Sequence, residues 1–215
     1  MKVLIACEES QTITAKYREN GIEAYSCDLK PAKINSDWHF QKDVFEVINL
    51  GWDLMIAHPP CTYLSFVGNV WLNIDKYGEK AIQRHKLRDE AMKFFMDLYN
   101  CNIPRIAIEN PRGYPMQVFR KPDQIIHPYY FGDEHKKTTC LWLKNLPKLE
   151  YSLTDNLFFK KTATKEPEPI YIQKNGKKCY FTDAMSPSKD RAEKRSKTFD
   201  GIASAIVNQW IFNCT

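Results

Sequence analysis

A cysteine that follows two prolines is the residue of this chain whose type and position point most directly to chemistry. Pro59-Pro60-Cys61 follows the apolar run Leu54–Ala57 after one residue, His58. Two proline rings fix the backbone direction, so the turn should present the thiol of Cys61 instead of packing it. Most cysteines outside disulfides are buried and inert, but a thiol held beyond the end of a strand is placed to react. We predict that Cys61 is a nucleophile.

A carboxyl group follows a second apolar run. Glu109 comes after Ile106-Ala107-Ile108 and before the turn Asn110-Pro111-Arg112-Gly113. Partial burial there disfavours the ionised form, which lets the group share or donate a proton. The alternative is a loop carboxylate paired with Arg112 or Arg105, which is the commoner case. Two reactive side chains at the ends of two such runs favour the chemical interpretation.

Two aspartates stand where a nucleoside is usually held. Asp28 ends the second predicted strand, the position from which a carboxylate accepts hydrogen bonds from ribose hydroxyls. Asp43, in Gln41-Lys42-Asp43-Val44, precedes a short helix and could equally be its N-cap. We predict Asp28 as a cofactor contact and leave both interpretations of Asp43 open.

The elements that position these side chains follow from hydrophobic periodicity. We expect strands at 2–7, 22–28, 53–57 and 103–108, and amphipathic helices that end at Asn20-Gly21 and span 79–101. Strands that alternate with helices pair in parallel through right-handed crossovers, which predicts a doubly wound α/β sheet. Ligands of such sheets bind beyond the carboxyl ends of the strands. One edge therefore gathers the polar groups Cys7-Glu8-Glu9-Ser10, Asp28, His58-Pro59-Pro60-Cys61 and Glu109-Asn110-Pro111.

The pattern changes after Pro128. We expect a strand at 138–143, an irregular segment at 150–169, and a hairpin around Asn175-Gly176 with arms at 171–174 and 177–181. A final helix carries one apolar face from Phe199 to Trp210, with Ser186 or Ser188 as its N-cap. A chain of 215 residues with no repeats and no long linker predicts one domain, 1–215.

Composition excludes several classes of protein. The seven cysteines show no CxxC spacing and no Cys/His cluster, which argues against a disulfide framework and against a metal site. The apolar start is too short for a signal peptide, and no run approaches a membrane span, so we expect a soluble cytoplasmic protein. The charge is +5, with the excess mainly after residue 135. A phosphate-bearing partner would suit that half, and a solvated lysine-rich surface explains it equally well.

The order of these motifs resembles that of the cytosine C5-methyltransferase family, most closely its compact phage-type members with a His-Pro-Pro-Cys-Thr-Tyr-Leu-Ser segment. That segment is 58–65 here, and Glu109-Asn110 matches the family's pair at the next strand end. The segment 131–139 is similar to a later basic strand, with His135, Lys137 and Thr139 at the positions of its glutamine and two arginines. The C-terminal helix is similar to one that packs beside the cofactor. Together the motifs span 3–211.

The resemblance implies a class I S-adenosyl-L-methionine (SAM)-dependent methyltransferase fold, with a small hairpin and irregular insertion before the last helix. It places a reduced target-recognition region at 148–194 and sets the protein in a bacterial cell or a phage-infected host. Two positions depart from the family pattern: the glycine-rich first loop is Cys7-Glu8-Glu9-Ser10-Gln11, and the glutamine after the cysteine is Thr62. Glycines allow a close backbone approach to a cofactor. The SAM contacts that the resemblance implies are therefore least supported in this loop.

The implied reaction is methylation of DNA at C5 of cytosine, with SAM as cofactor and no metal. The thiolate of Cys61 would add to C6 while Glu109 hydrogen-bonds N3 and the amino group. The implied catalytic residues are Cys61, Glu109, Asn110 and Lys137. The implied cofactor contacts are Cys7, Glu8, Ser10, Gln11, Asp28, Asp43 and Pro59. The implied substrate contacts are Pro60, Thr62, Arg112 and Thr139.

Two alternative functions stay open. Only about 45 residues stand where the family places a full recognition domain, so the substrate could be a free cytidine nucleotide or a single-stranded nucleic acid. The missing glycines suggest a third possibility, a SAM- or DNA-binding protein without catalysis. DNA is the favoured partner, with phosphate contacts from Arg112, Lys137 and the hairpin lysines Lys174, Lys177 and Lys178. Hairpin aromatics that could stack or simply pack are Tyr171, Tyr180 and Phe181.

Overall fold

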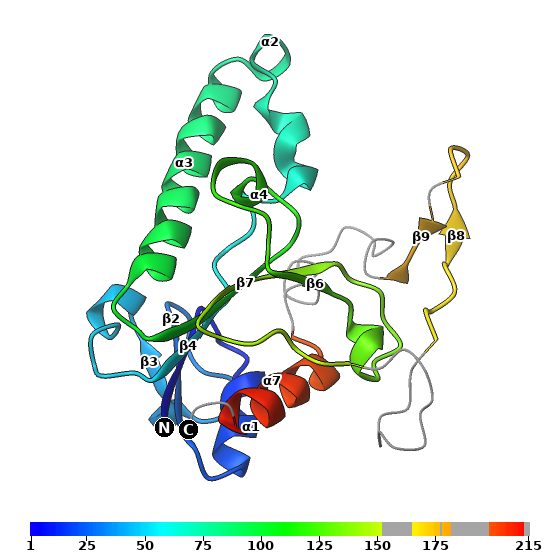
Figure 1. Ribbon diagram of the computed structural model, residues 1–215. Helices are drawn as coiled ribbons and strands as arrows, with labels where there is room; N and C mark the ends of the chain where they lie inside the picture. The colour runs from blue at the N-terminus through cyan, green and yellow to red at the C-terminus, as the bar shows by residue number, and fades with distance from the viewer. Residues whose placement is uncertain (152–164, 177, 182–197, 213–215) are drawn as a thin grey trace. The chain divides into compact units, whose positions relative to one another are not determined.

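The computed structural model describes residues 1–151, 165–176, 178–181 and 198–212 (Figure 1). The chain divides into two compact units, the first made of Met1–Ile125 and Thr139–Lys148, the second of Ile126–Thr138 and Leu149–Thr215. The predicted cap residues Ser186 and Ser188, the hairpin residue Lys177 and most of the segment 148–194 lie outside the described residues.

A seven-stranded, mostly parallel sheet forms the first unit, with the order β3-β2-β1-β4-β5-β7-β6. The strands are β1 (Lys2–Ala6), β2 (Glu23–Asp28), β3 (His39–Gln41), β4 (Leu54–Ala57), β5 (Arg105–Asn110), β6 (Gln124–Ile126) and β7 (Thr139–Lys144). β1 pairs in parallel with both β2 and β4, β2 with β3, and β4 with β5. β7 runs antiparallel to β5. The predicted α/β class is confirmed, and the sheet is Rossmann-like.

Helices connect and flank these strands (Figure 1). The α-helices of this unit are α1 (Thr12–Glu19), α2 (Ile74–Tyr77), α3 (Glu79–Asn100) and α4 (Pro115–Val118), and its short 3-10 segments are η1 (Ser36–Trp38), η2 (Val44–Glu46) and η3 (Phe66–Leu72). α1 ends where predicted, because Gly21 adopts φ 73°, the left-handed conformation that closes a helix.

Alternate residues of the strands build the core on one face of the sheet. Leu4, Met55 and Ile106 belong to one apolar cluster with Phe95 of α3, which is fully buried. The ring of Phe95 meets Trp142 of β7 edge-on, with 5.3 Å between centroids. Burial of an aromatic side chain of this size stabilises a fold by about 2–3 kcal/mol. This packing fixes the long helix α3 against the strands whose ends carry the predicted site.

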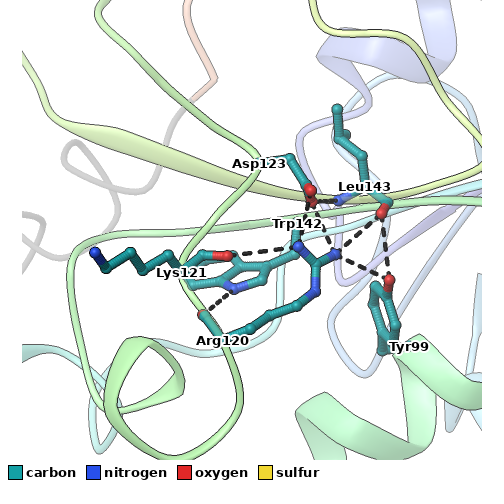
Figure 2. Close-up of polar contacts among 6 residues, drawn as sticks. All are labelled: Tyr99, Arg120, Lys121, Asp123, Trp142 and Leu143. Atoms are coloured by element: carbon teal, nitrogen blue, oxygen red, sulfur yellow. Dashed lines mark hydrogen bonds and ion pairs between the residues drawn. The ribbon is translucent and has the colours of Figure 1, made fainter.

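Arg120 fastens β7 to the end of α3 (Figure 2). Its guanidinium donates to Asp123 Oδ1 at 2.8 Å, to the Tyr99 hydroxyl at 2.9 Å and to the Leu143 carbonyl at 3.1 Å. Asp123 in turn accepts from the Leu143 amide at 2.7 Å, and the indole of Trp142 donates to the Arg120 carbonyl at 3.0 Å. The network gives hydrogen-bond partners to the amide and carbonyl of Leu143, and so holds β7 in place beside β5.

The second unit contains η4 (Pro128–Phe131), the two-stranded hairpin β8 (Tyr171–Ile172) and β9 (Lys178–Cys179), and α7 (Asp200–Phe212). The hairpin is antiparallel, with Ile172 opposite Lys178, so its strands are shorter than the predicted arms. Gly176 adopts φ 80° and its amide donates to the Gln173 carbonyl at 2.8 Å, whereas Asn175 lacks the positive φ of a two-residue Asn-Gly turn. The amide of Gly201 donates to Asp133 at 3.0 Å. The predicted hairpin and final helix are confirmed. The helix begins at Asp200, after the non-helical residues 198–199, so the expected N-cap at Ser186 or Ser188 is wrong.

Candidate active site

The turn that carries Cys61 leaves β4 at His58. The His58 amide donates to the Ala6 carbonyl of β1 at 2.9 Å, which extends the sheet by one residue before the prolines. Past them, the Cys61 carbonyl accepts from the amides of Leu64 at 3.1 Å and Ser65 at 2.9 Å. Cys61 itself is exposed, whereas Cys27 and Cys140 are buried. The sheet therefore presents this thiol at the surface on a rigid turn, as the sequence predicts.

The end of β5 is cross-linked to this turn. Ala57 lies opposite Ile108 in the register of the two strands, which brings His58 beside Glu109. The fully buried side chain of Asn110 donates to the Pro59 carbonyl at 2.8 Å. His58 Nδ1 lies 3.2 Å from Glu109 Oε2. The two predicted reactive segments are thus joined by two side-chain contacts at one edge of the sheet.

Backbone contacts join the same segments further out. The Tyr114 amide donates to the Leu64 carbonyl at 2.7 Å, and the Phe66 amide to the Arg112 carbonyl at 3.2 Å. The close approach requires a glycine between them, because a Cβ on Gly113 would overlap the Leu64 carbonyl oxygen and lie 3.1 Å from the Ser65 Cα. Arg112 keeps an exposed side chain. The loop after Cys61 and the loop after Glu109 consequently form one continuous structure.

A cavity of about 440 Å³ opens at the same edge, within the range of small-molecule sites. It lies beyond the carboxyl ends of β1, β2 and β4, where doubly wound sheets bind ligands. Its lining residues come from those ends, from the segment around η2 and from α3: Cys7, Cys27, Asp28, Leu29, Lys42, Asp43, Val44, Pro60, Thr62, Tyr63, Ala91 and Phe94.

Three of the predicted cofactor contacts line this cavity: Cys7, Asp28 and Asp43. Asp28 Oδ1 accepts from the Lys30 amide at 2.9 Å, which orients the carboxylate at the end of β2. Asp43 caps η2 by accepting from the Phe45 amide at 2.9 Å, so it is an N-cap and a lining residue together. Pro60 and Thr62, which the sequence assigned to the substrate, line the cavity too.

Glu8 and Gln11 have side chains engaged elsewhere. The buried carboxylate of Glu8 accepts from the Ile13 amide at 2.8 Å and the Thr14 hydroxyl at 2.7 Å, so it caps the start of α1. Burial raises the pKa of Glu8. The buried amide of Gln11 accepts from the Asn35 backbone at 2.7 Å and donates to Ser26 at 3.0 Å. Both hold the first loop together, and neither is among the described residues that line the cavity.

The remaining predicted residues have these places. Ser10 Oγ lies 3.2 Å from Thr12 Oγ1, and Pro59 is buried with its carbonyl bound to Asn110. Thr139 is buried at the start of β7. Lys137 belongs to the second unit, where its Nζ lies 5.9 Å from the centre of the Phe199 ring. None of these four lines the cavity as the described residues define it.

The first loop reaches its conformation without glycine. Cys7 and Gln11 adopt φ 60° and φ 57°, the left-handed region that L-residues rarely occupy. Gln11 is held there by its buried hydrogen bonds, and Cys7 by the hydrogen bond that its amide donates to the Cys27 carbonyl at 2.7 Å. The loop therefore has the backbone turn that glycines would give it, with a sulfur in the cavity wall.

Sequence reasoning missed several features of this site, of which four bear on its chemistry. Lys42, Tyr63 and Phe94 line the cavity, and His58 contacts Glu109. Tyr63 was visible within the Cys61 segment, and Phe94 lies on the helix face that periodicity assigns to the core. The sequence gives no sign of the His58 contact, because it arises only from the register of β4 and β5.

No protein-family model and no curated protein matches this chain. The interpretation of the site therefore rests on its own geometry. Among the described residues, no group of three or more His, Cys, Asp or Glu side chains is placed to hold a metal ion. In that same part of the chain, every helix is too short or too polar to cross a membrane.

Proposed function

We propose that the protein transfers a methyl group from SAM to C5 of cytosine in DNA, through a covalent bond between Cys61 and the base. The observation that carries this proposal is the exposed thiol of Cys61 on a turn cross-linked to Glu109-Asn110. A thiol and a carboxyl group at adjacent strand ends are the pair that covalent activation of a pyrimidine needs. The antiparallel β7 beside β5 is compatible with the class I methyltransferase type.

The cavity beside the turn fits a nucleoside cofactor. Asp28 ends β2 at the position from which a carboxylate accepts hydrogen bonds from ribose hydroxyls. Tyr63 and Phe94 offer aromatic surface to an adenine ring. When bound, SAM supplies an electrophilic methyl group. Pro60 and Thr62 line the cavity on either side of Cys61 in the chain, so the cofactor would lie next to the nucleophile.

The chain's own residues then perform the following steps. The Cys61 thiolate adds to C6, and the electron pair of the C5–C6 bond moves toward C5. Glu109 hydrogen-bonds N3 and the amino group, which stabilises the negative charge that this addition creates. After the methyl group joins C5, the C5 proton passes to solvent water, the C5–C6 double bond re-forms, and the C6–S bond breaks to release the thiolate. The buried Asn110 holds the Pro59 carbonyl, and with it the direction of the turn, throughout.

DNA is the proposed substrate because exposed basic side chains are available to contact its phosphates. Arg112 is exposed on the loop that follows Glu109, and Lys174 and Lys178 are exposed on the hairpin of the second unit. A base inside a duplex must leave the stack, which costs a few kcal/mol that backbone contacts offset. A single-stranded substrate avoids this cost.

Methyl transfer with labelled SAM tests the proposal. Wild type, Cys61→Ala and Cys101→Ala are incubated with duplex DNA, single-stranded DNA, RNA, or dCMP and CMP. We expect transfer to DNA by wild type and by Cys101→Ala, which removes a half-buried thiol at the end of α3, and none by Cys61→Ala. Methyl transfer by Cys61→Ala would contradict the assignment of Cys61 as the nucleophile. Transfer to dCMP or CMP alone would show that the substrate is a free nucleotide and not DNA.

A trapping experiment places the base. DNA that contains 5-fluorocytosine should form a stable adduct with wild type in the presence of SAM, because C5 has no proton to lose. Peptide mapping should find the adduct on Cys61. If SAM and DNA bind but neither transfer nor adduct occurs, the protein is a binding module and the proposed reaction is wrong.

A further inference from the structure

His58 follows β4, the strand that lies between β1 and β5, and a carboxyl group stands at or beyond the end of each of those neighbours. Its Nδ1 is 3.2 Å from Oε2 of Glu109, which belongs to β5. The buried Glu8, in the loop after β1, interacts electrostatically with His58. The His58 amide is itself tied to β1 through the Ala6 carbonyl. The imidazole is therefore held by the sheet and aimed at the carboxyl group that the proposed reaction needs.

The surroundings of the ring favour one tautomer. Nε2 of His58 is buried and has no hydrogen-bond partner among the described residues. A buried N–H without an acceptor is rarer in proteins than a buried acceptor without a donor. The proton of a neutral ring therefore belongs on Nδ1, where Glu109 Oε2 accepts it. The hydrogen bond that one ring nitrogen makes determines which tautomer a histidine adopts.

We propose that His58 is the positioning residue of Glu109, with Nδ1–H donating to Oε2 so that the other oxygen, Oε1, carries the proton that reaches N3 of cytosine. This inference rests on the proposed methyl transfer. In the step, the Oε1–H bond breaks as N3–H forms, and Glu109 becomes a carboxylate that still accepts from His58. When the thiolate leaves, N3 returns the proton to Oε1. His58 neither gains nor loses a proton.

Two further charged side chains act near this pair, one in the loop after β1 and one in the loop after β5. Glu8 faces His58 from the loop after β1, and burial raises the pKa of Glu8. Arg112, from the loop after β5, and Glu109 both interact with the buried Cys140 of β7, whose pKa burial raises to about 11. The neutral thiol of Cys140 adds no charge beside Glu109.

Three variants measure the positioning role through activity. His58→Asn keeps an N–H donor near the place of Nδ1, His58→Leu removes it, and His39→Asn alters another half-buried histidine whose ring contacts Ser26 and the Lys30 carbonyl. We expect His58→Leu to lower kcat about 100-fold with KM for DNA within threefold of wild type, and His58→Asn to recover at least about tenfold of that loss. His39→Asn should keep the wild-type kcat. A His58→Leu enzyme within threefold of wild type, or no recovery in His58→Asn, overturns the proposal.

A second readout needs no methyl transfer. ¹⁵N NMR of the wild-type protein with labelled histidine, assigned with His58→Asn, should show His58 protonated at Nδ1, and Glu109→Ala should move the proton toward Nε2. His39 should not respond. An Nε2–H ring in wild type overturns the positioning role even if methyl transfer is observed. If the His58 proton is on Nδ1 in wild type and moves to Nε2 in Glu109→Ala, but the protein methylates no substrate, the His58–Glu109 contact is supported and the proposed function is contradicted.

Discussion

The backbone of Gly113 lies against the carbonyl group of Leu64, so close that no side chain fits between them. This contact joins the loop after Glu109 to the loop after Cys61. The first prediction follows from it. Gly113→Ala should push the two loops apart, cost about 1–3 kcal/mol of stability, and lower the rate of 5-fluorocytosine adduct formation at least about tenfold, because the thiol and the carboxyl group lose their common frame.

Gly21→Ala is the matched control for that substitution. Gly21 closes α1 at φ 73° with open space around its Cα, so alanine there costs stability through backbone strain alone. Denaturant unfolding of both variants measures the stability loss. Equal adduct rates for Gly113→Ala and Gly21→Ala would contradict a local effect at the loops.

The Arg120–Asp123 network supports a prediction about acid (Figure 2). Hydrogen bonds from Arg120 and from the Leu143 amide hold the pKa of Asp123 below its usual value against the opposing effect of burial. Asp123→Asn should lower the free energy of unfolding by about 1–2 kcal/mol at pH 7. Because the folded-state pKa is the lower one, this stabilisation is fully present above about pH 4 and is lost as the pH falls through the folded value. Unfolding curves of both proteins should therefore converge below pH 4, and a constant difference down to pH 2.5 would contradict the assignment.

Asp28 should contribute to cofactor affinity. Asp28→Asn keeps the size of the side chain and the bond from the Lys30 amide but removes the charge that attracts ribose hydroxyls. We expect SAM to bind about tenfold more weakly, which corresponds to about 1.4 kcal/mol, as measured by isothermal titration calorimetry. Asp37→Asn, an exposed acid outside the cavity, should bind as wild type does. Unchanged affinity in Asp28→Asn would remove Asp28 from the cofactor site.

The hairpin lysines should contribute to DNA affinity through charge alone. Lys174→Glu/Lys178→Glu should weaken duplex binding and reduce the slope of log affinity against log salt concentration by about 2, since each lysine neutralises one phosphate. Fluorescence anisotropy at several salt concentrations measures this. Lys86→Glu/Lys93→Glu on α3 changes the net charge equally and should alter the slope less. If both double variants behave alike, the effect belongs to net charge and not to the hairpin.

Periodicity predicts the elements with long hydrophobic patterns and misses the short ones. The strands β1, β2, β4 and β5 and the helix α3 follow from apolar runs and helical spacing. β3 and β6 have three residues each, too few to show alternation. β7 was expected as a strand, but its antiparallel direction depends on how the chain returns through 111–138, which no local pattern records.

The residues of the candidate site also divide into those that the sequence predicts correctly and those that it does not. Cys61, Glu109 and Asp28 stand out in the sequence because a reactive side chain follows an apolar run. Glu8 and Gln11 stand equally close to a strand end, yet they cap α1 and brace the first loop. Position along the chain places a residue at the sheet edge, but it does not decide whether the side chain turns outward to a ligand or back into the fold.

Pro60 and Thr62 line the cavity, and the residue between them is the exposed Cys61. A ligand large enough to fill the cavity would contact both neighbours of the thiol and so restrain its backbone. Occupancy of the cavity and the geometry of the thiol are therefore thermodynamically linked, and by reciprocity a base captured on Cys61 changes the affinity of the cavity by the same factor. A molecule that spans both, with a nucleoside in the cavity and a pyrimidine at Cys61, would gain from this coupling as well as from its two sets of contacts.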